Sequence, residues 1–197
     1  MKTITLSNEV MVSDPGYEMG TFCQHKLTDV LPGEYQCTVV KFLGNKCSYI
    51  IAVHKDYNTE DKLNWRKVAT ADIGVDSGQA GIFSMETYRN DSVFVSGSRK
   101  ENDGEEWYDY MSEMTVDGDR WGTYPNGIVS QSGNGDGSYE LRVAKHKGKI
   151  VGMVLDFHIV FLTGPIIESI RKENMLGDVC GICGEDNVDS VSCNCKM

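Results

Sequence analysis

Residues 127–157 constrain the fold of this chain more than any other stretch. They hold two strand-like runs, Tyr139–Lys145 and Lys149–Phe157, joined at Lys147-Gly148. A short glycine-containing turn between such runs predicts an antiparallel hairpin. Ahead of the hairpin, residues 132–138 (SGNGDGS) place three glycines within five positions. Glycine is used where the backbone needs a positive φ or passes close to another group, so this turn is a candidate site.

Other runs favour a fold that is mainly β. Tyr35–Phe42 and Cys47–His54 are rich in β-branched and aromatic residues and predict a second antiparallel hairpin. Residues 3–6 and 10–12 form two short strand-like runs that we interpret as a third hairpin. Residues 72–83 indicate two buried strands with a glycine-bearing loop between them. We therefore expect a mainly β (α+β) fold, with a β-sandwich or barrel-like antiparallel core.

One or two short helices accompany these strands. Trp107, Tyr110, Met111 and Met114 follow the spacing i, i+3, i+4, i+7, which predicts an amphipathic helix over residues 105–115 with this stripe in the core. Residues 165–175 begin with proline and predict a second helix. The expected domains are a β-rich core over 1–163, a helical linker over 164–178 and a cysteine knuckle over 179–197.

Charge and length restrict the possible functions. The chain has 197 residues, enough for one domain of ordinary size, and a net charge of -10. This balance argues against nucleic acid as a partner, because binding to phosphates needs clustered Lys and Arg. No apolar run approaches the length of a membrane span, and MKTITLSNEV lacks the apolar centre of a signal peptide. We expect a cytoplasmic protein in a reducing compartment, where thiols stay free or bind metal.

Four of the seven cysteines lie in the last 18 residues, as Cys180, Cys183, Cys193 and Cys195. Cys-x-x-Cys followed by glycine is typical of a zinc knuckle, although the second pair is Cys-x-Cys and the gap of nine residues is short. A structural zinc ion is our first interpretation, because so short a tail cannot build a core alone. A redox-active thiol cluster and an unstructured tail are the alternatives.

Polar residues at the glycine-bearing turns form the candidate ligand site. A carboxylate, a hydroxyl and an amide at one bend can bind a small polar ligand or a cation, but they can equally cap the turn. His54, at the end of a predicted strand, is either a rim residue or a site residue. The candidates are Asp14, His54, Asp76, Ser77, Gln79, Ser132, Asp136, Ser138, Tyr139 and Arg142.

Three of these segments together resemble a bacterial and bacteriophage family described as a domain of unknown function. The segments are Ser13-Asp14-Pro15, residues 74–78 (GVDSG), and residues 133–139 (GNGDGSY) before a strand ending in Asp156-Phe157. The similarity covers about residues 3–160 and leaves the cysteine tail out. Gly16 stands where phage relatives more often have cysteine. The resemblance implies a mostly β domain in a phage or bacterial cytoplasm and brings no assigned activity.

These observations favour a binding protein whose loops bring Asp14, Asp76 and Asp136 near one another. Its partner would be a small polar molecule or a host protein, including one involved in host processes or defence. The main alternative is a metal- or carboxylate-dependent hydrolase that uses Asp76 and Asp136. The sequence lacks H-E-x-x-H, G-x-S-x-G and a phosphate loop, which weighs against the enzyme. A structural or assembly protein is the second alternative.

Overall fold

The computed structural model describes residues 1–42, 45–57, 63–91, 105–116 and 118–158. The predicted second helix, the linker over 164–178 and the knuckle over 179–197 lie outside these residues. The four tail cysteines and their zinc ion therefore stay predictions.

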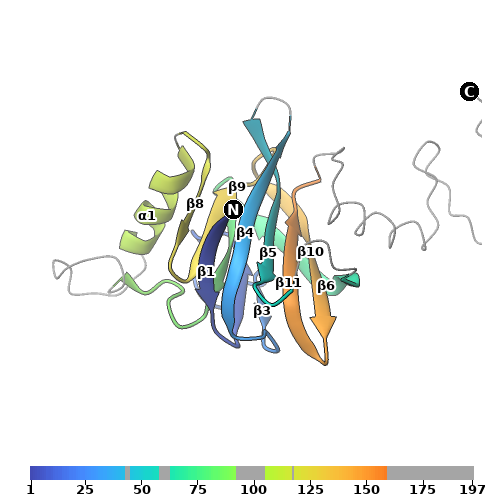
Figure 1. Cartoon of the computed structure of the whole chain (residues 1–197). Coiled ribbons are helices and arrows are strands. Elements are labelled where there is room, and N and C mark those ends of the chain that lie inside the picture. The colour runs from blue at the N-terminus through green and yellow to red at the C-terminus, as the bar shows by residue number, and fades with distance from the viewer. Residues whose placement is uncertain (43–44, 58–62, 92–104, 117, 159–197) are drawn as a thin grey trace, which may run out of the picture.

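Two antiparallel sheets pack face to face and confirm the mainly β prediction, in its sandwich form (Figure 1). Sheet A has the strand order β1 (Lys2–Leu6), β4 (Gly33–Phe42), β5 (Lys46–His54), β11 (Lys149–Asp156), β10 (Gly137–His146) and β6 (Trp65–Val75). Sheet B has the order β3 (His25–Leu27), β2 (Val10–Ser13), β7 (Gln79–Ser84), β9 (Gly127–Gln131) and β8 (Trp121–Tyr124). Each sheet keeps two edge strands, so neither closes into a barrel.

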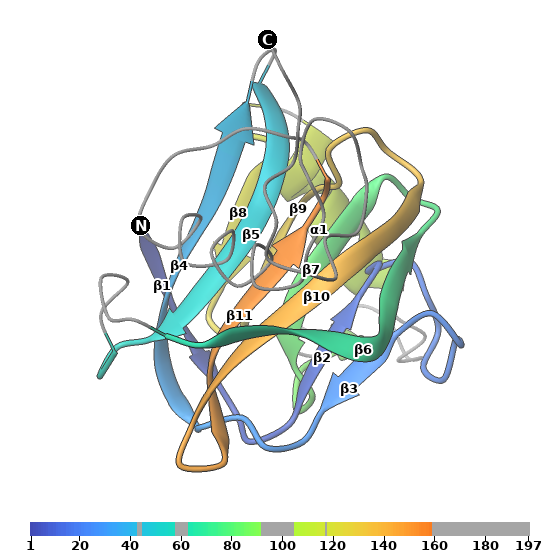
Figure 2. The ribbon, with the colours of Figure 1, turned by 90° about the vertical axis from the view of Figure 1, so that its right-hand side faces the viewer.

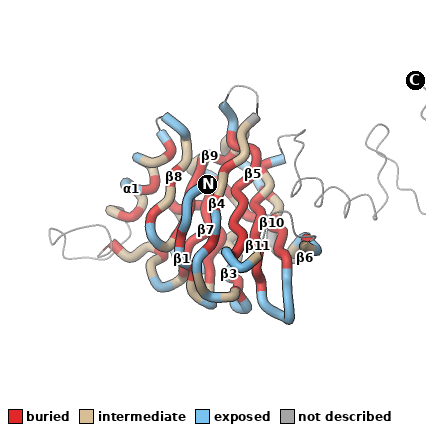
Figure 3. Tube along the Cα trace, viewed as in Figure 1, coloured by how far each residue is buried: buried red, intermediate tan, exposed pale blue. Residues whose placement is uncertain are grey.

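The main core lies between the two sheets. Leu6 from β1 and Ile50 from β5 meet Ile82 from β7 and Ile128 from β9, and all four side chains are buried. The central strands β5, β7 and β11 are buried along nearly their whole length and on both faces, while several connecting turns are exposed (Figure 3). Removal of this apolar surface from water is the main force that holds the sheets together.

Two of the predicted hairpins are confirmed. β10 pairs with β11 and β4 pairs with β5, both in antiparallel register. At the tip of the first hairpin, Lys147 has φ 48° and Gly148 has φ 80°. Positive φ at both central residues is what a type I′ turn requires, and this turn matches the right-handed twist of its strands.

The third predicted hairpin is wrong. β1 pairs with β4 in sheet A, whereas β2 pairs with β3 and β7 in sheet B. Residues 7–9 thus carry the chain from one sheet to the other. Ile4 and Val10 are both buried in the space between the sheets. An alternating apolar pattern reports only that one face of a strand is buried, so it cannot tell a hairpin from a crossover.

The first predicted helix is confirmed as α1 (Glu105–Val116), which packs on the outer side of sheet B (Figures 1 and 2). Trp107 and Met111 are fully buried there, but Tyr110 is 38% exposed, so the expected stripe is wrong at that position. Tyr108 packs against the cluster instead. With 3.6 residues per turn, the buried face is centred between Trp107 and Met111 and extends toward Tyr108, which leaves Tyr110 at its margin. Within the described residues, no helix is long and apolar enough to cross a membrane.

Candidate functional site

The two glycine-rich loops meet at one end of the sandwich. Gly137 pairs with Val75, which brings the start of β10 beside the end of β6. The backbone N–H of Ser132 donates to the carbonyl oxygen of Gly78 over 2.9 Å. The loops over 74–79 and 132–138 are therefore neighbours, although more than fifty residues separate them in the sequence.

Asp14 fastens the N-terminal turn to the first glycine-rich loop. Its Oδ1 accepts from the Gly16 N–H at 2.7 Å and from the Ser77 hydroxyl at 2.7 Å. Its Oδ2 accepts from the backbone N–H groups of Asp76 at 2.9 Å and Ser77 at 2.7 Å. The side chain is fully buried, and four hydrogen bonds satisfy both oxygens. Asp14 thus caps two turns, with both carboxylate oxygens occupied by groups of the protein itself.

Tyr139 and Ser132 hold the second glycine-rich loop. The Tyr139 hydroxyl lies 2.9 Å from the carbonyl oxygen of Ser132 and 2.7 Å from that of Gly135. The Ser132 hydroxyl donates to the same Gly135 oxygen over 2.6 Å. Burial raises the pKa of Tyr139 above its ordinary value, so the phenol keeps its proton and remains a donor. These hydrogen bonds of Tyr139 and Ser132 fix the shape of the second glycine-rich loop.

A pocket of about 360 Å³ lies between the loops and the end of α1. Gly78 and Gly135 border it with φ of 69° and 102°, and open space surrounds the position where each would carry a Cβ. Glycine lets the backbone turn there and leaves its polar groups accessible from the pocket. The lining residues are Ser77, Gly78, Gln79, Thr115, Val116, Gln131, Ser132, Gly133, Asn134 and Gly135.

Gln79 is the most informative of the lining residues. It is 7% exposed, and its Nε2 donates to the Ser112 hydroxyl over 3.2 Å. Its Oε1 is buried with no hydrogen-bond partner. An exchange of the amide oxygen and nitrogen would leave Nε2 without a partner instead, so one polar atom is unpaired in either orientation. A buried polar atom without a partner costs free energy and calls for an explanation.

The electrostatic character of the pocket comes from dipoles. Among the described residues that line it, no side chain is ionisable. Thr115 and Val116 belong to the last turn of α1, where carbonyl oxygens lack partners within the helix and carry a partial negative charge. One of them, that of Thr115, accepts from Gln131 Nε2 at 3.0 Å. The surroundings favour a ligand that donates hydrogen bonds.

Three other predicted residues flank this pocket without lining it. Asp76, Asp136 and Ser138 are exposed on the same two loops. Burial, together with hydrogen bonds to Asp76 and Cys23, raises the pKa of Tyr17, so the phenol next to Asp76 stays protonated. The carboxylates of Asp76 and Asp136 add negative charge at the rim.

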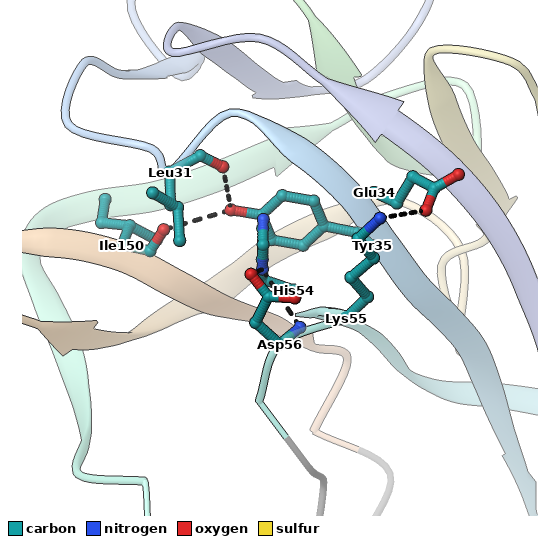
Figure 4. Close-up of polar contacts among 7 residues, drawn as sticks. All are labelled: Leu31, Glu34, Tyr35, His54, Lys55, Asp56 and Ile150. Carbon is teal, nitrogen blue, oxygen red and sulfur yellow. Dashed lines mark hydrogen bonds and ion pairs between the residues drawn. The ribbon is translucent and has the colours of Figure 1, made fainter.

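His54 lies at the opposite end of β5 from the glycine-rich loops, because Lys46, at the start of that strand, contacts Asn134. Figure 4 shows its ring beside Tyr35, with 5.2 Å between ring centroids and an edge-on angle of 88°. The backbone N–H of Asp56 donates to His54 Nδ1 over 3.3 Å, so this nitrogen acts as an acceptor. His54 is a buried packing residue of the β4–β5 pair.

Arg142 also lies away from the pocket. It pairs in register with Lys67 and Val154, and Val154 packs in the apolar cluster apart from the inter-sheet core. Its Nη2 donates to Glu140 Oε2 over 2.6 Å. Arg142 therefore stands on the outer face of sheet A and does not line the pocket.

Sequence reasoning missed three lining residues, Thr115, Val116 and Gln131. The first two end a helix, and Gln131 ends a strand next to the second loop. Gln131 directly precedes the candidate residue Ser132, and this position could have identified it as a lining residue. The position of the helix end depends on how Trp107 packs against sheet B, and no local pattern reports that.

Within the described residues, no group of three or more His, Cys, Asp or Glu side chains is placed to hold a metal ion. Comparisons with protein-family models, with curated proteins and with solved structures found no match.

Proposed function

We propose that this protein is a small-ligand-binding β domain whose site is the pocket between the two glycine-rich loops. The ligand is a small polar molecule that donates hydrogen bonds. The observation that carries the proposal is the buried Gln79 amide, which borders the pocket with one polar atom unpaired. Because this atom is closed off from solvent in the structure, a ligand hydroxyl or amine reaches it only after a shift of the Gln79 side chain, and would then offset the cost of its burial.

The rest of the lining supports a donor-rich ligand. The last turn of α1 presents acceptors, and the exposed carboxylates of Asp76 and Asp136 flank the loops. The partial negative charge of the helix end and the two carboxylates would both repel an anionic ligand. Polyols, sugars and small amines share the required donors, and the volume of about 360 Å³ suits molecules of this size.

A titration monitored by amide ¹H–¹⁵N correlation spectra tests the proposal. We use glucose as the neutral polyol, ethanolamine as the amine, and acetate as a small anion that only accepts hydrogen bonds. The amides of Gly78, Gly133 and Gly135 should shift with glucose or ethanolamine and stay in place with acetate. Shifts confined to the opposite end of the sandwich, or none with either donor, would contradict the proposal.

The hydrolase remains a second candidate on one observation. Asp76 and Asp136 belong to neighbouring loops, and both carboxylates are exposed. The single and double Asn variants give a direct test, because two groups that share one site lose binding or activity non-additively. Additive effects on stability alone would remove this candidate.

A host protein as partner, in a phage or bacterial cytoplasm, also stays a proposal. The net charge of -10 supports a partner with a basic surface. Affinity purification of the full chain from a bacterial lysate, at low and at high salt, tests it. A specific partner should be recovered at low salt and released at high salt. Recovery of none would count against this role.

A further inference from the structure

A second and larger pocket, of about 570 Å³, opens at the other end of β10, away from the glycine-rich loops. Strand β3 with the two residues after it forms one wall, and the first half of β6 forms the other. The end of β10 and the start of β11 close it from behind. Its lining residues are His25, Lys26, Leu27, Thr28, Asp29, Asn64, Arg66, Lys67, Val68, Val143, Lys145 and Ile150.

The back of this pocket is apolar and continuous with the main core. Leu27, Val143 and Ile150 are buried members of the inter-sheet cluster, and Val68 packs against it. Two backbone hydrogen bonds fix this wall, from Ile150 N–H to Asp29 O at 2.7 Å and from Leu31 N–H to Ile150 O at 2.9 Å. The pocket therefore offers a fixed hydrocarbon surface.

Two cationic residues occupy positions on the inner face of sheet A at this end. Arg66 is the register partner of Val143, and Lys145 is the register partner of Ile150. Directly opposed residues on antiparallel strands place their side chains on the same face of the sheet. Val143 and Ile150 both face the core, whereas Arg66 and Lys145, on the same face of the sheet, are exposed where they line the pocket.

The pocket is also positive within a protein of net charge -10. Among its described lining residues, four are Lys or Arg and Asp29 is the single carboxylate. Lys26 is bound to Glu9 at 2.9 Å, and Lys67 to Glu140 at 2.9 Å. For Arg66 and Lys145, no carboxylate of the described residues lies within ion-pair distance, and Arg66 Nε donates to the neutral Asn64 Oδ1 at 3.1 Å.

From this arrangement we propose that the pocket binds a small organic anion, with its apolar body against Val143 and Ile150 and its carboxylate between Arg66 and Lys145. A guanidinium and an ammonium give the strongest hydrogen bonds to such a group. Burial lowers the pKa of His25, so this wall adds a neutral imidazole and not a further charge. The site is separate from the glycine-loop pocket and does not depend on its function.

Calorimetric titration of the full chain with hexanoate tests this site. Hexanoate should bind in the millimolar range or tighter, and added salt should weaken the binding. Two further titrations use hexanamide and inorganic phosphate. Hexanamide has the same alkyl chain as hexanoate but no charge, and phosphate has negative charge but no alkyl chain. Both should bind at least about fivefold more weakly, the equivalent of about 1 kcal/mol. Failure of hexanoate to bind, or equal affinity for either of the other two, would overturn the proposal.

Single substitutions then test whether Arg66 and Lys145 bind the carboxylate of hexanoate. Arg66→Gln and Lys145→Gln should each weaken hexanoate binding about fivefold or more. Lys41→Gln is the matched control, because Lys41 belongs to β4 and pairs with Asp119 at 3.2 Å, away from this pocket. It should keep the affinity of the parent protein. Equal losses in all three variants, or none in Arg66→Gln and Lys145→Gln, would show that these two cations do not hold the ligand.

Discussion

Asp14 and Ser77 are 63 residues apart in sequence, yet the carboxylate of Asp14 accepts from both the hydroxyl and the backbone N–H of Ser77, each at 2.7 Å. This contact joins the N-terminal turn to the loop that borders the glycine-loop pocket. The loop is therefore held in place before any ligand arrives. Such preorganisation lowers the cost of ordering a site upon binding.

The Asp14 contact predicts a large loss of stability for a conservative change. Asp14→Asn replaces one acceptor by an NH₂ group, which would then face another donor in a fully buried place. Urea unfolding should show a loss of about 3 kcal/mol. Asp136→Asn, at an exposed carboxylate, is the control and should change the free energy of unfolding by less than about 0.5 kcal/mol. Similar small effects in both variants would contradict the role of Asp14.

Trp107 anchors α1 to sheet B. Its ring lies edge-on to Phe83 at 4.9 Å between centroids, and its Nε1 donates to the carbonyl oxygen of Pro15 over 3.1 Å. Trp107→Ala should destabilise the protein by about 3–5 kcal/mol, from lost transfer energy and the cavity left behind. Tyr110→Ala, on the exposed margin of the same helix, should cost less than about 1 kcal/mol. A reversed order in thermal unfolding would mean that α1 packs through a different face.

Alkaline pH should weaken the fold through Cys37. Burial raises the pKa of this thiol from its ordinary 9.0 to about 12 in the folded protein. The stabilising contribution is therefore complete below the unfolded-state pKa and is lost as pH rises toward the folded-state pKa. Between about pH 8 and about pH 10, Cys37 should account for a loss of about 1.4 kcal/mol.

Urea unfolding of the parent protein and of Cys37→Ala at both pH values isolates this contribution. The variant should lose less stability over the interval, whatever its absolute stability at the lower pH. Equal losses in the two proteins would mean that Cys37 does not titrate in the unfolded state as expected.

The cysteine tail predicts about one zinc ion per chain in purified full-length protein. Cys183→Ser should abolish zinc binding, whereas Cys23→Ser, at a thiol near the N-terminal turn, should leave the zinc content unchanged. Metal analysis together with thiol titration measures both. Zinc content that is insensitive to Cys183→Ser would contradict the knuckle and favour a redox role for the thiols.

Local patterns predicted the elements whose partners are close in sequence. Lys147-Gly148 specifies the turn between β10 and β11, and the Trp107–Met111 spacing specifies α1. Crossovers between sheets depend on distant pairing, which is why β1 and β2 were misassigned to one hairpin. The same limit applies to His54, because a strand pattern does not say at which end of a sandwich the strand finishes.

The glycine-rich segments predicted two loops, which the structure brings side by side, but they did not predict the surroundings of each residue. Asp14 and Gln79 both accompany turn residues in the sequence. Only the packing distinguishes them, because Asp14 is fully hydrogen-bonded and Gln79 is not. Arg66 is absent from the candidate residues of the sequence, and the structure places it in β6 opposite Val143. Its place on the inner face depends on that register.

The most direct test of the proposed function compares Gln79→Met with the parent protein. Methionine keeps the length of the side chain and removes the unpaired amide atom, so the free energy of unfolding should stay within about 1 kcal/mol of the parent value. The shifts of Gly78, Gly133 and Gly135 amides on addition of the donor ligand should disappear. A loss of more than about 2 kcal/mol with ligand shifts retained would show that Gln79 serves the fold and would contradict a ligand site at this pocket.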